Sequence, residues 1–310
     1  MSSFLVPHRT ALTGSELAVE LPAGGGLGIG AEPSAARRPS ALAKWFSARL
    51  LSVRDNWRPA AGRFLLAWVL PLAVFALWWA AAKYGWVAEQ ILPAPAFVAQ
   101  TFGELWQSGD ITTNLGISLL RVVYGFLIGA GLGLVLGVSM GLSPVAKDYI
   151  HPIFNAFAQV PSLGWLPLLM MLVGIEESLK IILITKAVLV PVAINTFQGI
   201  SNTPTRLIEV ARVYNFTRSQ LLRKVVFPAA FPQIWAGVRF GMTKAWLALV
   251  AVELLASSEG LGFLLVYGRQ LFQLDVVMSA VIVVGAVGFT LDKGLELVER
   301  RLLRWRRESF

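Results

Sequence analysis

A succession of long apolar stretches constrains this chain most, because a helix needs about 20 such residues to cross a bilayer core. The composition agrees: 56% of the residues are hydrophobic, 15% are charged, and the mean hydropathy is +0.65. The sequence therefore predicts an all-α integral membrane protein with six transmembrane helices. The six stretches are Phe64 to Ala82, Leu115 to Leu142, Pro152 to Gly174, Leu179 to Phe197, Ala229 to Ala256 and Val276 to Leu291.

The third stretch is the least regular of the six. Pro161 and Pro167 interrupt it, and Gly164 lies between them. Backbone groups freed at such a break need protein or water as partners at membrane depth. We therefore expect this broken helix to lie inside the helix bundle.

The second stretch carries many glycines on what would be one helix face. This pattern favours close packing against a neighbouring helix over a phosphate cradle. The glycines concerned are those at positions 125, 129, 131, 133, 137 and 141.

The basic residues predict the orientation of the chain. Segments 1–63, 143–151, 200–228 and 292–310 together hold twenty of the 27 Lys and Arg residues. The segments on the other side of the predicted spans hold only Lys83 and Arg269. Positive charge is retained in the cytoplasm, so we expect a multi-pass membrane protein with both termini cytoplasmic. This bias accounts for the net charge of +9 without a nucleic-acid partner.

Composition divides the chain into three regions. Residues 1–63 are rich in Gly, Pro and Arg and predict a partly disordered basic tail, with an amphipathic surface helix near Ser40 to Val53. Residues 64–291 form the predicted transmembrane domain, and residues 292–310 form a basic cytoplasmic tail. The chain has no cysteine, which excludes disulfides and thiolate chemistry.

A polar loop, residues 200–228, separates the fourth and fifth apolar stretches. It predicts two short helices joined by a sharp corner, the first capped by Thr205 and the second by Thr217. Asn215 stands at the corner, where a left-handed backbone is needed, and Pro228 marks the return to apolar sequence.

This loop resembles the cytoplasmic "EAA" loop of permeases in ATP-binding cassette (ABC) importers. Glu209, Ala211 and Pro228 match that pattern, Asn215 stands where Gly is usual, and Val210 replaces the middle Ala. The resemblance implies a coupling helix that docks on an ATPase subunit. The alternative is a connector whose charges lie in water or against anionic headgroups. The coupling role is carried to Glu209, Ala211, Arg212, Asn215, Arg218 and Pro228.

Other segments resemble the branch of this family that transports aliphatic sulfonates, taurine and nitrate. The resemblance covers residue 64 to the end and implies a type I importer permease (MetI-like) fold. It also implies a location in the bacterial inner membrane, a homodimer, two cytoplasmic ATPase subunits and an extracytoplasmic solute-binding protein. The matching segments are Ile91-Leu92-Pro93-Ala94-Pro95, the run from Pro161 to Leu168, Gly237-Val238-Arg239 and the run from Ser258 to Gly262.

The sequence contains no Gly-rich phosphate loop ending in Lys-Ser or Lys-Thr. We therefore expect ATP and Mg to bind the partner ATPase, with no cofactor bound by this chain. Its two histidines, His8 and His151, lie near no carboxylate motif, so we predict no catalytic residue, no metal site and no enzyme activity.

Polar residues within the spans are candidates for a translocation path, since a buried charge usually faces a cavity or a partner. For the charged ones, the alternatives are a structural pair with Glu253 or snorkelling of Lys244; for the neutral ones, hydrogen bonds between helices. Arg121 is expected at outer headgroups or a carboxylate, and Glu176 and Lys180 as a surface pair. The path candidates are Gln159, Ser162, Lys186, Arg239, Thr243, Lys244, Trp246 and Glu253, with Asn195 beside them.

The resemblance implies a small anion as the cargo, in the first place an aliphatic sulfonate or taurine. Nitrate, bicarbonate and other small solutes stay open, because the binding protein does most of the selecting. A secondary transporter is the rival class, since broken helices and intramembrane charges suit it as well.

Overall fold

The computed structural model describes residues 68–304, and within them the backbone is helical, with no strands. The predicted tail helix near Ser40 to Val53 lies outside the described residues. The beginning of the first apolar stretch and the last six residues of the chain also lie outside them. The described helices after Trp68–Lys83 are α2 (Pro95–Gln107), α3 (Asp110–Leu142), α4 (Pro144–Gln159), η1 (Ser162–Trp165), α5 (Leu166–Val173), α6 (Glu177–Ser201), α7 (Thr205–Val213), α8 (Arg218–Leu221), η2 (Leu222–Val226), α9 (Phe227–Ala256), α10 (Leu261–Gln270) and α11 (Leu274–Leu302).

Three of these helices, α3, α6 and α11, are long and apolar enough to cross a membrane. The count rises to five if the bent pairs α4 with η1–α5 and α8–α9 with α10 are each taken as one span. Helix Trp68–Lys83 is a shorter apolar helix, and its predicted beginning at Phe64 is not described. The all-helical membrane class is therefore confirmed, while the count of six stays a prediction.

The α3–α6 pair forms the centre of the domain, and its glycines explain why. A Cβ added at Gly129 would lie 2.5 Å from the Thr185 carbonyl oxygen, and one at Gly137 would lie 2.5 Å from the Thr196 Cβ. Gly125, Gly133 and Gly141 meet α6 in the same way, whereas Gly131 has nothing within 4 Å. The predicted packing face is confirmed at five of its six glycines, which let the two backbones approach closely.

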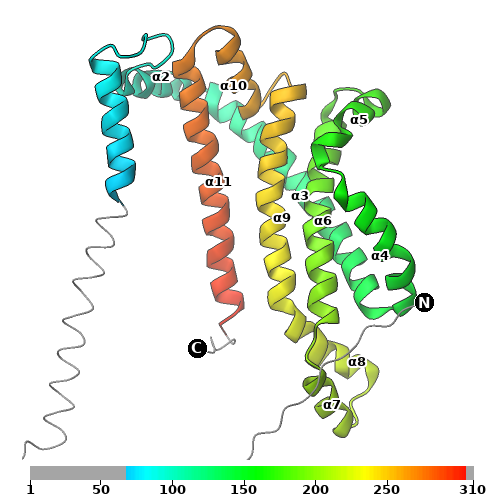
Figure 1. Ribbon diagram of the computed structural model, residues 1–310. Helices are drawn as coiled ribbons and strands as arrows, with labels where there is room; N and C mark the ends of the chain where they lie inside the picture. The colour runs from blue at the N-terminus through cyan, green and yellow to red at the C-terminus, as the bar shows by residue number, and fades with distance from the viewer. Residues whose placement is uncertain (1–67, 305–310) are drawn as a thin grey trace, which may run out of the picture. The chain divides into compact units, whose positions relative to one another are not determined.

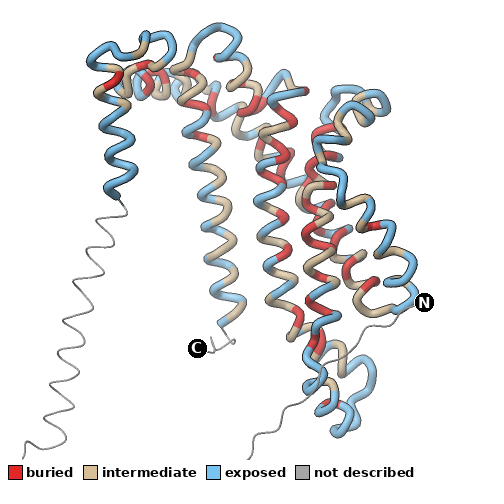
Figure 2. Tube along the Cα trace, in the orientation of Figure 1, coloured by how far each residue is buried: buried red, intermediate tan, exposed pale blue. Residues whose placement is uncertain are grey.

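Helix α9 packs on α6 beside α3, and Val188 and Val192 of α6 meet glycines of both helices. Gly237 and Gly241 of α9 face Asn195 and Val192 of α6, and Val188, Val192 and Leu249 are fully buried between the helices. Figure 2 shows the buried positions gathered on α6 and on the facing sides of α3 and α9, while Trp68–Lys83 is almost wholly exposed.

The predicted broken helix bends by 87° between α4 and η1–α5. It breaks at Pro161, as the sequence indicated, because proline disfavours a helical residue before it and cannot donate to the helix ladder. The expected burial is not found in the single chain: Phe154 is the only buried residue of α4, and α5 has none.

At the far end of α9, α10 and α2 pack on the first turns of α11. Val276, Ser279, Ala280 and Val283 are the buried residues of α11, and Thr101 of α2 donates a 2.7 Å hydrogen bond to Asp275. Figure 1 shows α7 and α8 at the opposite end of α9, on the same side as the C-terminal end of α11.

Candidate functional site

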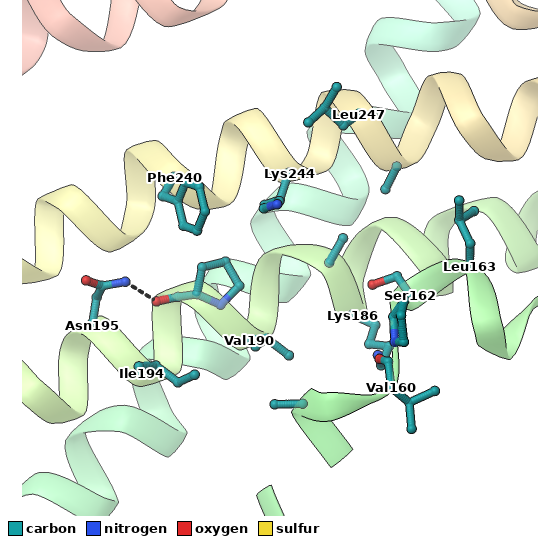
Figure 3. Close-up of a pocket in the computed structure, with 15 residues that line it drawn as sticks. Val160, Ser162, Leu163, Lys186, Val190, Ile194, Asn195, Phe240, Lys244 and Leu247 are labelled. Carbon is teal, nitrogen blue, oxygen red and sulfur yellow. Dashed lines mark hydrogen bonds between the residues drawn. The ribbon is translucent and has the colours of Figure 1, made fainter. Parts of the chain in front are cut away.

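A cavity of about 480 Å³ lies where the helix break meets α6 and α9. Figure 3 shows residues of all three elements around it, including Val160 and Ser162 from the break, Lys186 from α6 and Lys244 from α9. Most of the wall is apolar, with Val190, Ile194, Phe240 and Leu247 among its members.

Lys186 is buried, with 8% of its surface exposed. Its ammonium group donates to the backbone carbonyl of Val160, the residue directly after α4. It also lies over two aromatic rings, 4.9 Å from the Phe157 centroid and 5.6 Å from the Trp165 centroid. A carbonyl at a helix C-terminus and two ring faces are favourable for a cation, but none of them carries a full negative charge.

Lys244 is exposed on the same cavity, and its ammonium group lies 5.1 Å from the centroid of the Phe240 ring. No ion pair within the described part of the chain involves Lys186 or Lys244. Among the described residues that line the cavity, none is acidic. The cavity is therefore an apolar hollow with two cations and no built-in counterion.

Of the predicted path residues, the structure places Ser162, Lys186 and Lys244 on this cavity, together with Asn195. Gln159 is exposed at the end of α4, next to Val160, but is not part of the lining. Thr243 and Trp246 line a second, smaller cavity of about 210 Å³ that also contains Asp292.

Arg239 lies away from both lysines and binds α11 instead. Its guanidinium group is 3.0 Å from Asp292, 3.0 Å from Glu299 and 3.8 Å from Glu296. These contacts fix the C-terminal half of α11 to α9. The architectural alternative thus accounts for Arg239, although its acidic partners are on α11 and do not include Glu253.

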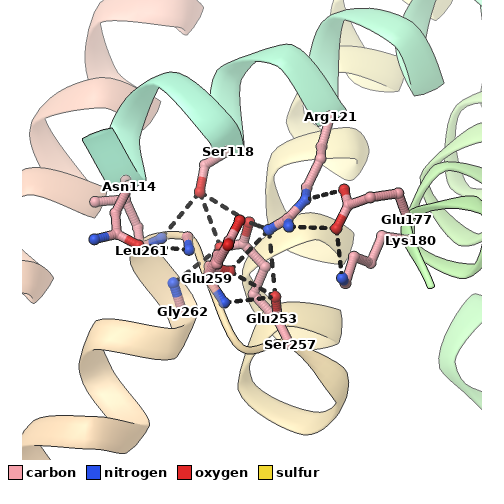
Figure 4. Close-up of polar contacts among 11 residues, drawn as sticks. Asn114, Ser118, Arg121, Glu177, Lys180, Glu253, Ser257, Glu259, Leu261 and Gly262 are labelled. Atoms are coloured by element: carbon pink, nitrogen blue, oxygen red, sulfur yellow. Dashed lines mark hydrogen bonds and ion pairs between the residues drawn. The ribbon is translucent and has the colours of Figure 1, made fainter. Parts of the chain in front are cut away.

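Glu253 is also remote from the cavity and is 1% exposed. Its carboxylate accepts hydrogen bonds from Ser118 at 2.8 Å, from the Arg121 guanidinium at 2.8 Å and from the backbone N–H of Gly262 at 2.9 Å (Figure 4). A fully bonded, paired carboxylate is a structural centre, and here it joins α3 to the α9–α10 turn.

Arg121 is the cation at the middle of this network. It also bonds Glu177 of α6 through two parallel contacts of 2.6 Å and donates to the Glu259 carbonyl at 2.8 Å. The prediction of a carboxylate partner for Arg121 is confirmed. The Glu176–Lys180 surface pair was wrong, because Lys180 is buried and its ammonium group lies 2.7 Å from Glu177.

The same network explains two glycines of the run Ser258 to Gly262. Gly260 has a φ of +105°, and a Cβ there would lie 2.3 Å from Glu253 Oε1. A Cβ on Gly262 would lie 2.5 Å from the Glu253 Cβ. Only glycine allows the turn to close over the buried carboxylate.

The polar loop takes the predicted form of two short helices and a corner. Asn215 has a φ of +52°, and the Phe216 N–H returns to the Ala211 carbonyl at 3.0 Å, which is the hydrogen bond of a left-handed helix end. Thr217 and Gln220 form a reciprocal capping box at the start of α8. The predicted Thr205 cap was wrong, since α7 begins after Pro204 and has no side-chain cap.

The loop is joined to α9 without interruption. Helix α8 passes through the π-helical turn η2 into α9, whose first turn contains Pro228. A proline ring clashes with the carbonyl four residues earlier in a regular helix, and the wider π turn relieves that clash.

The loop surface is both charged and apolar. Glu209, Arg212, Asn215 and Arg218 are exposed, whereas Ala211 is 3% exposed. A cavity of about 480 Å³ opens beside α7, lined by residues that include Val210, Ala211, Tyr214, Phe216 and Pro228. Exposed apolar residues around such a hollow are typical of a docking surface.

These features describe a helical membrane protein that surrounds a small cationic cavity and exposes a rigid polar loop, with no metal-binding cluster in residues 68–304. The chain belongs to the family described as binding-protein-dependent transport system inner membrane component, whose model matches residues 129–304.

Curated relatives agree with this membership. A Bacillus subtilis (strain 168) protein described provisionally as the aliphatic sulfonates transport permease SsuC is 39% identical, over 80% of this chain and 92% of its own length. The taurine transport system permease TauC of Escherichia coli (strain K12) is 32% identical over 84% of this chain and 97% of its own length. The nitrate import permease NrtB of Synechocystis (strain PCC 6803) is 34% identical over 67% of this chain and 79% of its own length.

A crystal structure of an amino acid ABC transporter with histidines supports the fold alone. Its TM-score is 0.50 at 19% identity, and the match covers 64% of this chain and 97% of that one.

The chain is thus an ABC importer permease subunit of the sulfonate, taurine and nitrate branch, in the inner membrane. It is a non-catalytic subunit, and ATP hydrolysis belongs to a partner ATPase. This membership decides against a secondary transporter.

Proposed function

We propose that the cavity of Lys186 and Lys244 is part of the translocation path for a small anion, with an aliphatic sulfonate or taurine as the cargo. The observation that carries this proposal is the pairing of two cations with a wall that contains no acidic residue among those described. Such a wall attracts anions and repels cations. The sulfonate and taurine permeases among the relatives support the choice of cargo.

Nitrate, bicarbonate and other small solutes are the competing cargoes, and the nitrate permease relative favours the first of these. The decisive experiment reconstitutes the chain with its partner ATPase and its solute-binding protein. ATPase activity should rise when the binding protein carries an alkanesulfonate or taurine, and less with nitrate or bicarbonate. Equal activity with empty and loaded binding protein would contradict the proposal.

The working assembly in this proposal is a homodimer of the permease with two cytoplasmic ATPase subunits and an extracytoplasmic binding protein. ATP and Mg bind in the ATPase, and this chain binds no cofactor of its own. Both termini are cytoplasmic, which places the α7–α8 loop where ATP is. Its position on the side of the C-terminal end of α11 supports that orientation (Figure 1).

The α7–α8 loop is the proposed coupling segment. The capping box of α8, the fixed corner at Asn215 and the unbroken junction with α9 make it stiff enough to transmit a rigid-body movement. Glu209, Arg212 and Arg218 are exposed for contact with the ATPase, whereas Ala211 and Pro228 shape the loop itself.

Charge reversal tests this role. We expect Glu209→Arg to reduce substrate-stimulated uptake about tenfold or more, since truncating or reversing a docked charge costs a few kcal/mol. Uptake into vesicles and co-purification of the ATPase are the measurements. Glu89→Arg, an exposed carboxylate before α2, is the matched control. Normal uptake by Glu209→Arg would refute the coupling assignment.

A further inference from the structure

The ammonium group of Lys186 contacts two parts of the structure. It donates to the carbonyl of Val160, the extended residue that follows α4 at the 87° break, and it also belongs to the wall of the cavity. Figure 3 shows Lys186 beside Val160, with Ser162 of η1 next to them. The lysine of α6 therefore joins the cavity to the break.

A carbonyl oxygen carries a partial negative charge, so the hydrogen bond from Lys186 stabilises the extended backbone at Val160, where the chain turns into Pro161. The Phe157 and Trp165 rings, one on each side of the break, lie 4.9 and 5.6 Å from the same ammonium group. The single positive charge of Lys186 thus interacts with the Val160 carbonyl and with both rings, and so stabilises the break.

An anion in the cavity would compete for that charge. A full negative charge attracts an ammonium group more strongly than a carbonyl dipole or a ring face does, because the attraction between two opposite charges exceeds that between a charge and a dipole. Lys244, exposed on the opposite wall and unpaired with any described carboxylate, would supply the first contact. Val190, Ile194 and Leu247 would cover an apolar tail.

We propose that the cavity binds an organic monoanion with a short apolar tail, and that its occupant draws Lys186 from the Val160 carbonyl and so loosens the break between α4 and η1. Lys244 is the primary anion contact, and Lys186 is a positioning residue that links occupancy to the break. This inference rests on the proposed path but adds a movement to it.

The test uses the full-length chain in lipid nanodiscs without any ATPase. Butane-1-sulfonate is titrated against it, and hydrogen–deuterium exchange is followed in peptides covering residues 155–166. We expect exchange at the break to rise about fivefold or more on binding, the change that follows from losing one hydrogen bond to a charged group in a local opening. 1-Butanol, which has the tail without the charge, should cause no change.

Three variants separate the two lysines. Lys244→Gln should weaken butane-1-sulfonate binding about tenfold while leaving exchange at the break of the empty protein unchanged. Lys186→Gln should give fast exchange at the break with or without the anion. Lys147→Gln, an exposed lysine of α4 outside the cavity, should behave as the unchanged protein.

Anion binding without altered exchange at the break would overturn the linkage, as would native exchange in Lys186→Gln. Absence of measurable binding at the cavity would overturn the site itself. Stimulation of ATPase by loaded binding protein in the reconstituted complex is independent of these results. If that stimulation occurs while exchange at the break stays constant, the importer proposal stands and only this inference fails.

Discussion

Two regions of this domain bury a cation in different ways. Arg121, 3% exposed, faces two carboxylates, Glu177 and Glu253, and a backbone carbonyl, all at hydrogen-bond distance (Figure 4). Lys186, 8% exposed, has a carbonyl and two aromatic rings and no carboxylate within the part of the chain described (Figure 3).

The difference separates architecture from function. Burying a charge is costly in either place, and a charge that already has its counterions has little capacity left for a ligand. A cation left with neutral partners beside a cavity keeps that capacity. The residue type alone does not distinguish a cation with carboxylate partners from a cation with neutral partners, since both are ionisable residues within apolar helices.

The largest effect on the free energy of unfolding should come from removing Arg121 from its carboxylate partners. Arg121→Met leaves Glu253 buried without its cation, and we expect a loss of about 3–5 kcal/mol in the free energy of unfolding. Denaturant unfolding of the purified chain in detergent measures it. Glu177→Gln is the matched comparison, because Glu177 is 55% exposed and its loss should cost less. Equal losses from the two variants would mean that burial of Glu253 does not control stability.

A smaller effect should follow when the network is disturbed through the backbone. A Cβ at Gly125, one turn after Arg121, would lie 2.5 Å from Ile184 Cγ2, so Gly125→Val should push α3 from α6 and cost about 1–3 kcal/mol. The same unfolding measurement applies. Gly131→Val is the control, since nothing lies within 4 Å of a Cβ there, and it should cost less than 1 kcal/mol. A loss as large in the control would contradict the packing role.

The smallest effect on stability should come from the cavity. Lys244→Gln removes an exposed charge with no carboxylate partner among the described residues, so unfolding should change by no more than about 0.5 kcal/mol. Uptake of the anionic cargo by the reconstituted complex should nevertheless fall strongly. A variant that is destabilised like Arg121→Met would place Lys244 in the architecture and remove the contrast between the two regions.

Local features were the ones that could be predicted from sequence. The corner at Asn215, the cap at Thr217, the break at Pro161 and the glycine face of α3 each depend on residues within a few positions of one another. Their physics is backbone conformation and helical spacing, which a sequence displays directly.

Pairings between distant residues could not be predicted. Glu253 is 132 positions from Arg121, and Arg239 is 53 positions from Asp292, so neither pair has a signal in periodicity or spacing. For the same reason Glu253 and Arg239 were grouped with the path residues, although the structure gives each a set of partners away from the cavity. The burial expected for α4 and α5 is not found in the single chain, because burial depends on neighbours that a break motif does not specify.

The glycine face of α3 has a mechanical consequence. The backbones of α3 and α6 are in close contact at every fourth residue of α3, so one helix could slide or tilt against the other only if whole turns separated. The two helices should therefore move as one rigid body. Movements that open or close the cavity should then occur where helices are held by side chains alone. Two such places are the break after α4, where Lys186 donates to Val160, and the salt bridges between α9 and α11.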